Sequence, residues 1–166
     1  ADASAVAPMR SALAYSVLAI EDAQGVVATG WAIAPDLVVT AYRAVGTKSP
    51  SDLTVAGTVP AEATVLTPET FGVAAGQAGR VRELLRLLRN DDQLRSSGLL
   101  VLHVPGLHAV PLPIAENSDV PLAAGTRVFV PSRGRRGGLR VNVAPVTAAG
   151  PDSLTLGMPA DTREGG

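Results

Sequence analysis

The 166-residue chain contains no cysteine, so disulfide bonds, a thiolate nucleophile and thiolate metal sites are all excluded. Aromatic residues are also scarce, at 3% of the sequence, and the stacking platforms that nucleic-acid bases use are therefore missing. The formal net charge of −1 supplies no general attraction to nucleic acid or to an anionic membrane. No apolar run reaches the roughly 18 residues of a membrane-spanning helix. We expect neither a nucleic-acid partner nor a membrane span.

Small aliphatic residues dominate what is present. Hydrophobic residues make up 46% of the chain, and the 17 glycines and 13 prolines fall between the apolar runs, as turn residues do. Short apolar runs at this spacing are typical of an all-β sandwich or barrel. The expected strands are residues 12–20, 25–34, 37–40, 53–59, 63–66, 99–104, 127–130, 139–146 and 153–156. The first two form a hairpin around the sequence EDAQ, and residues 41–46 form one helical turn.

The segment 79–90 breaks the strand pattern. Its apolar residues follow the i, i+3, i+4, i+7 spacing of a single helical stripe, and they are Val81, Leu84, Leu85 and Leu88. We expect a surface helix that uses this stripe to cap one end of a barrel. The alternative is a partner-binding helix that exposes either the stripe or its arginines, which are Arg80, Arg82, Arg86 and Arg89.

The segment GWAIAPDLVVTAYRAVG, residues 30–46, resembles the region around the catalytic His of trypsin-like serine proteases, especially of their bacterial HtrA-like branch. In that family a glycine and a buried strand lead into the sequence Thr-Ala-Ala-His and a short helix. Gly30, Thr40 and Ala41 match this pattern, whereas Arg43 stands where the family has the His.

A second segment, GLLVLHVPG at residues 98–106, is similar to the family's strand that begins with the catalytic Asp, and here Gly98 holds that position. A third segment, PLPIAENSDVPLAAGTRVFVPS at residues 111–132, is similar to the link between the family's two barrels. The order, spacing and apolar pattern agree over residues 11–132 and more loosely beyond them.

The resemblance implies an all-β fold of two six-stranded-type antiparallel β-barrels, with one inserted helix near residues 79–90. Residues 1–115 would form the N-terminal barrel lobe with its helical insertion, and residues 116–166 part of the C-terminal barrel lobe. Because those last residues supply about half of a barrel, we expect its missing strands on another segment or on a second chain.

The two replaced positions remove the chemistry that a serine protease needs. A Ser nucleophile requires a general base that titrates near working pH, as an imidazole does. A guanidinium stays charged at any working pH and can only donate hydrogen bonds, so Arg43 cannot take the Ser proton. Gly98 has no side chain with which to orient a cation. The resemblance therefore predicts a degenerate catalytic triad.

The residue that corresponds to the third member of the triad, the Ser nucleophile, depends on how the C-terminal sequence DTREGG is aligned, and two registers are possible. In the family the nucleophile lies in a G-x-S-G-G-type turn. If the two final glycines follow the nucleophile, Glu164 occupies the Ser position. If they precede it, the chain stops one residue short of the Ser, and Asp161 lies at the bottom of the specificity pocket. Neither register restores a base.

The two histidines and an arginine-rich loop are further candidate functional residues. His103 and His108 could form a two-His metal site or a relocated base, but side chains on the surface or rim are the expected interpretation. The segment SRGRRGGLR, residues 132–140, could bind phosphate or carboxylate, and a solvated loop between strands is the expected interpretation. We expect no metal site and no cofactor.

We interpret the chain as a catalytically inactive trypsin-like domain that acts as a protein- or peptide-binding or scaffolding module. Its partner would be a protein or peptide, paired as an extended strand in the cleft between the barrels, or the missing C-terminal strands themselves. The candidate binding residues are the arginines of the expected helix. The alternative is an active serine hydrolase with its nucleophile just beyond residue 166 and a base recruited from His103 or His108.

The composition and the resemblance also bear on the source and location of the protein. Lys48 is the single lysine among fourteen basic residues, a bias that GC-rich genomes produce. The sequence begins Ala-Asp-Ala without Met, and signal-peptide cleavage and tag removal both explain this. We expect a soluble bacterial protein, either cytoplasmic or exported after N-terminal processing.

Overall fold

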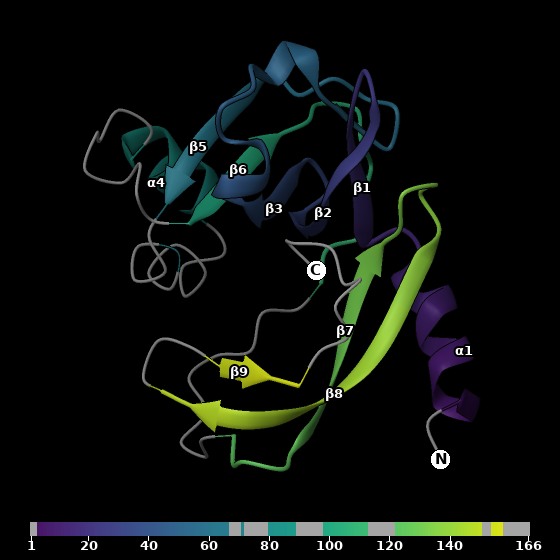
Figure 1. Ribbon diagram of the computed structural model, residues 1–166. Helices are drawn as coiled ribbons and strands as arrows, with labels where there is room; N and C mark the ends of the chain where they lie inside the picture. The colour runs from purple at the N-terminus through teal and green to yellow at the C-terminus, as the bar shows by residue number, and fades with distance from the viewer. Residues whose placement is uncertain are drawn as a thin grey trace.

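The computed structural model describes residues 3–66, 71, 80–88, 98–112, 122–150 and 154–157. Within these residues, two antiparallel sheets carry most of the structure (Figure 1). The strands are β1 Val17–Asp22, β2 Gly25–Ala34, β3 Leu37–Ala41, β4 Thr54–Val55, β5 Glu62–Leu66, β6 Leu99–His103, β7 Arg127–Arg133, β8 Leu139–Ala149 and β9 Leu154–Leu156. The helices are α1 Ala3–Leu13, α2 Tyr42–Val45, the 3-10 helix η1 Pro50–Asp52 and α4 Val81–Leu88. This content confirms the all-β prediction.

The larger sheet has six strands in the order β4-β1-β2-β3-β6-β5, and the smaller has three in the order β7-β8-β9. Strand β3 and the single helical turn α2 follow the sequence predictions closely. Strands β1 and β2 form the expected hairpin, but its turn is Ala23 and Gln24, because Glu21 and Asp22 belong to β1. In the described part of residues 116–166, the three strands form one antiparallel sheet. No described helix combines the length and the apolar character needed to cross a membrane.

The N-terminal segment differs from the strand expected over residues 12–20. Helix α1 extends to Leu13, and a turn closed by the Ser16 N–H on the Leu13 carbonyl, at 3.0 Å, separates it from β1. The strand prediction was wrong before Val17, because a short run rich in Ala and Leu suits a helix as well as a strand.

The strand expected over residues 53–59 is also shorter than predicted. Strand β4 has two residues, after which Ala56 and Gly57 adopt positive φ angles of 47° and 85°. Left-handed backbone cannot continue a strand, so the chain turns back and Val55 bridges to Thr58.

Strands β3 and β6 are buried on both faces of the larger sheet, because successive side chains of a strand point to opposite sides. On one face Val38, Leu100 and Leu102 join a core cluster with residues of β1 and β2. On the opposite face Leu37, Val39 and Val101 join a second cluster. This double burial explains the uninterrupted apolar sequence of the two strands.

Helix α4 covers the second of these faces, beside β5 (Figure 1). Val81 and Leu85 are buried in the second cluster, and Leu84 is half-buried. Two residues of the stripe, Val81 and Leu85, therefore pack on a face of the sheet, whereas the side chain of Leu88 lies outside the described residues. Arg82 and Arg86 lie on the exposed side of the helix.

The two sheets are joined through Arg133, the last residue of β7. Its guanidinium donates hydrogen bonds to the carbonyls of Ala14 and Val17, at 2.8 and 2.9 Å, and to that of Gly137 at 2.9 Å. Its backbone N–H donates to the Thr29 hydroxyl in β2 at 2.8 Å. Helix α1 also packs alongside β8, so the start of the chain lies against the smaller sheet (Figure 1).

Candidate functional site

Arg43 and Gly98 are brought to the same end of the larger sheet. Strands β3 and β6 pair with Ala41 opposite Leu99, and the Tyr42 N–H donates to the Gly98 carbonyl at 2.9 Å. Helix α2 is anchored by the buried Val45, which leaves the Arg43 side chain exposed. The two positions that the resemblance selected are thus neighbours in space, although they lie 55 residues apart in the sequence.

The backbone at Gly98 has the conformation that glycine adopts most easily. Its φ angle is +88°, and a Cβ built there would meet no heavy atom within 4 Å. Any other residue would be strained by the backbone, at a cost of about 1–2 kcal/mol, but it would not clash. An Asp could therefore occupy this position only with local strain.

The two histidines lie at the opposite end of β6. His103 is paired with Leu37 at the start of β3, and the residue after His108, Ala109, donates its N–H to the Pro35 carbonyl at 2.9 Å. The strand rises about 3.3 Å per residue, so the four steps from Leu99 to His103 separate its two ends by on the order of 13 Å. Neither histidine is thus placed to serve as a base beside Arg43.

His103 is instead part of a charged cluster centred on Asp36, in the turn between β2 and β3. Its Nε2 lies 3.0 Å from Asp36 Oδ2, and the same carboxylate oxygen accepts a hydrogen bond from Arg82 of α4. Asp36 thereby ties α4 to the turn between two central strands of the sheet. Nothing in the local sequence marks Asp36 for this role, since its partners Arg82 and His103 lie 46 and 67 positions away.

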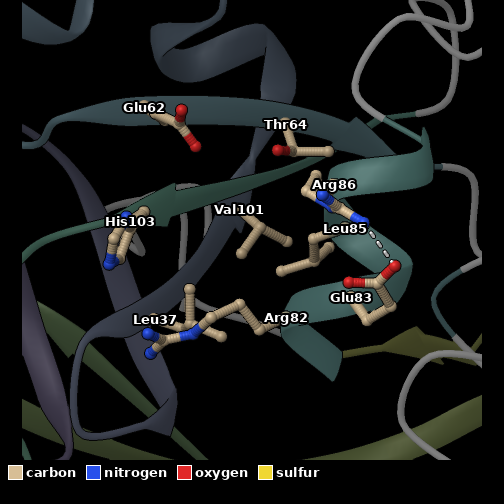
Figure 2. A pocket seen from close by; sticks show the side chains of 9 residues that line it. All are labelled: Leu37, Glu62, Thr64, Arg82, Glu83, Leu85, Arg86, Val101 and His103. Carbon is tan, nitrogen blue, oxygen red and sulfur yellow. Dashed lines mark hydrogen bonds and ion pairs between the residues drawn. The ribbon is translucent and has the colours of Figure 1, made fainter. Parts of the chain in front are cut away.

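A pocket of about 330 Å³ opens between α4 and the face formed by β3, β6 and β5. Its lining residues, drawn in Figure 2, are Leu37, Glu62, Thr64, Arg82, Glu83, Leu85, Arg86, Val101 and His103. Leu85 and Val101 lie at its centre, with Glu62 and His103 to one side and Glu83 and Arg86 to the other. The apolar floor comes from the sheet and the helix stripe, and the charged groups stand around it.

The four arginines proposed as binding residues differ in where the structure places them. Arg82 and Arg86 both line the pocket, and each is held by a carboxylate: Arg82 by Asp36, and Arg86 by Glu83 at 2.6 Å. Arg80 is exposed at the start of the helix and is not a pocket residue. Arg89 lies outside the described residues.

The arginine-rich loop contains one residue whose role the sequence did not suggest. Arg133 is half-buried and donates three hydrogen bonds to backbone carbonyls. Burial lowers the pKa of its guanidinium, which stays charged at neutral pH. Arg135 and Arg136 are exposed in the turn between β7 and β8. The loop is therefore partly structural rather than wholly solvated.

Two further predictions concern metals and the C-terminus. Among the described residues, no group of three or more His, Cys, Asp or Glu side chains is arranged to hold a metal ion. Asp161 and Glu164 lie outside the described part of the chain, and the register of the third triad position stays a prediction.

Comparisons with known proteins address the fold. A mutant of human heparin binding protein matches with a TM-score of 0.56 and 13% identity, over 91% of this chain and 73% of its own. Another mutant of that protein gives a TM-score of 0.52 and 14% identity, over 86% and 65% respectively. The chain has a trypsin-like fold. At these identities the likeness establishes the fold alone, and the chain spans about two thirds of these neighbours' length.

A protease from M. tuberculosis in its active form shares 21% identity over 93% of this chain and 62% of its own, with a TM-score of 0.49. The fold assignment rests on the two higher-scoring matches. A scan against protein-family models finds no match, and a search of curated proteins finds none either.

Proposed function

We propose that this chain is a catalytically inactive trypsin-like domain that acts as a protein- or peptide-binding or scaffolding module. The observation that carries the proposal is that Arg43 and Gly98 lie together at one end of the sheet. There the Tyr42 N–H donates to the Gly98 carbonyl, and Arg43 is the next residue of α2. In a trypsin-like fold these two positions supply the base and the group that orients it. An arginine and a glycine can do neither.

The same geometry counts against the alternative of an active hydrolase with a relocated base. Both histidines belong to the far end of β6, and His103 is committed to Asp36. A general base must come within about 3 Å of the proton it removes, directly or through one water molecule. A separation on the order of 13 Å is too large for a side-chain rotation to overcome.

A binding role fits the features that remain. The sheet face under α4 carries a pocket whose rim includes ion pairs, and such concave, partly apolar sites are where ligands and peptides commonly bind. The partner class is a protein or peptide, or strands that complete the second lobe. The division into lobes at residues 1–115 and 116–166 belongs to this proposal.

A fluorophosphonate probe tests the loss of catalysis, because it labels activated Ser nucleophiles. We expect no labelling of the folded protein under conditions in which trypsin, as the control, is labelled to completion. Stoichiometric labelling at a single Ser would refute the proposal and favour the active hydrolase. Peptide binding by the unlabelled protein, measured in parallel, tests the other half of the proposal.

A further inference from the structure

We propose that the pocket beside α4 is the recognition site of this domain and that it takes one aliphatic side chain, Leu, Ile, Val or Met, from an extended partner peptide. The inference rests on the proposed binding function, and it adds where the peptide lies and which side chain selects it. The site is distinct from the end of the sheet that carries Arg43 and Gly98.

The size of the pocket limits its occupant. At about 330 Å³ it is near the lower end of the range of small-molecule sites, which run from roughly 300 to 1,000 Å³. A single side chain with its flanking backbone fits this space. A short segment of an extended chain is therefore an occupant of the right size.

The floor of the pocket selects an apolar group. Leu37, Val101 and Leu85 are buried members of one core cluster and form the base, and the side chain of Thr64 lies beside them (Figure 2). These side chains are fixed by the packing of β3, β6 and α4, so the base of the pocket is preformed. Burying one aliphatic side chain against such a floor favours binding by on the order of tenfold to a hundredfold.

The rim shows that the occupant is uncharged. Both arginines that line the pocket are already neutralised, Arg82 by Asp36 and Arg86 by Glu83. An anionic ligand would have to break one of these pairs and would meet the carboxylates of Glu62 and Glu83 as well. A cationic ligand would have to compete with Arg82 and Arg86 for the carboxylates that already hold them. A neutral side chain meets neither penalty, and the paired rim remains available for contacts with peptide backbone.

A variant at Thr64 tests the assignment. Thr64→Phe places a ring in the pocket from β5, and Thr54→Phe makes the same change in β4, which lines a separate open hollow with Asp22 and Lys48. The probes are heptapeptides selected from a random display library on the wild-type protein and then synthesised. Dissociation constants are measured by fluorescence anisotropy for the wild type and both variants.

We expect the selected peptides to share one aliphatic position, and we expect its replacement by Ala to weaken binding at least tenfold. Thr64→Phe should weaken binding by a similar factor, while Thr54→Phe should change it less than twofold. If Thr64→Phe does not fold, the methyl NMR signals of Leu37, Leu85 and Val101 in the wild type decide, since the peptide must shift them.

The outcomes separate this inference from the function on which it rests. Peptides that bind Thr64→Phe as tightly as the wild type, leave the three methyl groups unshifted or converge on a charged residue would overturn the pocket assignment and leave peptide binding intact. A library that yields no binding peptide at all would overturn both this inference and the peptide-binding part of the proposed function.

Discussion

Replacing Arg133 should destabilise the whole domain, because this residue holds the smaller sheet against the larger one. Its guanidinium donates to the carbonyls of Ala14, Val17 and Gly137, each at 2.8–2.9 Å. Arg133→Met keeps much of the aliphatic stem and removes all three bonds. The three carbonyls then lose a charged donor, and two of them belong to the segment that enters the larger sheet.

The magnitude follows from the number of bonds and from their exposure. A hydrogen bond to a charged group contributes roughly 1.5–3 kcal/mol, so three at the low end give about 4.5 kcal/mol. The site is half-exposed, so water replaces part of this loss, and removing a desolvated cation returns some free energy. We expect Arg133→Met to lower the free energy of unfolding by about 2–3 kcal/mol. For a domain of this size that loss corresponds to a Tm lower by about 4–12 °C.

Urea unfolding followed by circular dichroism, together with calorimetry, measures this effect. Arg133→Lys should lose about half as much, because an ammonium group keeps the charge but cannot span three carbonyls as a planar fork does. Arg135→Met, an exposed position in the same turn, is the matched control and should change stability by less than about 0.5 kcal/mol. An Arg133→Met protein as stable as this control would refute the role assigned to Arg133.

Three further predictions concern single residues. Leu85→Ala should lower the free energy of unfolding by about 2–4 kcal/mol, because Leu85 is 6% exposed and its loss leaves a cavity under α4. Urea titrations measure this change, and a loss below about 1 kcal/mol would contradict the packing of the helix stripe. Gly98→Asp should lower the free energy of unfolding by about 1–2 kcal/mol in the same assay, since φ is +88° there. The double variant Gly98→Asp/Arg43→His should still show no fluorophosphonate labelling, and labelling of it would show that a usable nucleophile is present. Asp22 has its pKa lowered chiefly by the hydrogen bond from Lys48, so its stabilising effect is complete above its ordinary pKa of 3.8 and is lost as the pH falls further. Asp22→Asn should therefore flatten the decline in stability below pH 3.8, and an unchanged acid profile would count against the pair.

The secondary-structure elements that could be predicted from the sequence are those determined by local apolar patterns. The hairpin of β1 and β2, the buried strand β3 and the stripe of α4 each follow from the period of apolar residues over a short stretch. Helix α1 was missed because its sequence, ASAVAPMRSAL, shows no clear helical stripe and contains Pro8, a residue that ordinarily interrupts a helix. The resemblance identified Arg43 and Gly98, and the pairing of Ala41 with Leu99 places them together.

The residues that sequence reasoning missed act through contacts between distant parts of the chain. Asp36 meets His103 across 67 positions, and Arg133 meets Val17 across 116. Nothing in the local composition of a turn or a hairpin predicts such partners, because they are set by how sheets and helices pack after each has formed. The pocket has the same origin, since its lining comes from three strands and a helix.

Strand β6 sets the distance between the pocket beside His103 and the end of the sheet that carries Arg43 and Gly98. Its core residues Leu100, Val101 and Leu102 are packed on both faces, so the strand has little freedom to slide or bend. A segment bound beside His103 is therefore held at a fixed separation from the surface around Arg43, and the length of β6 sets that separation.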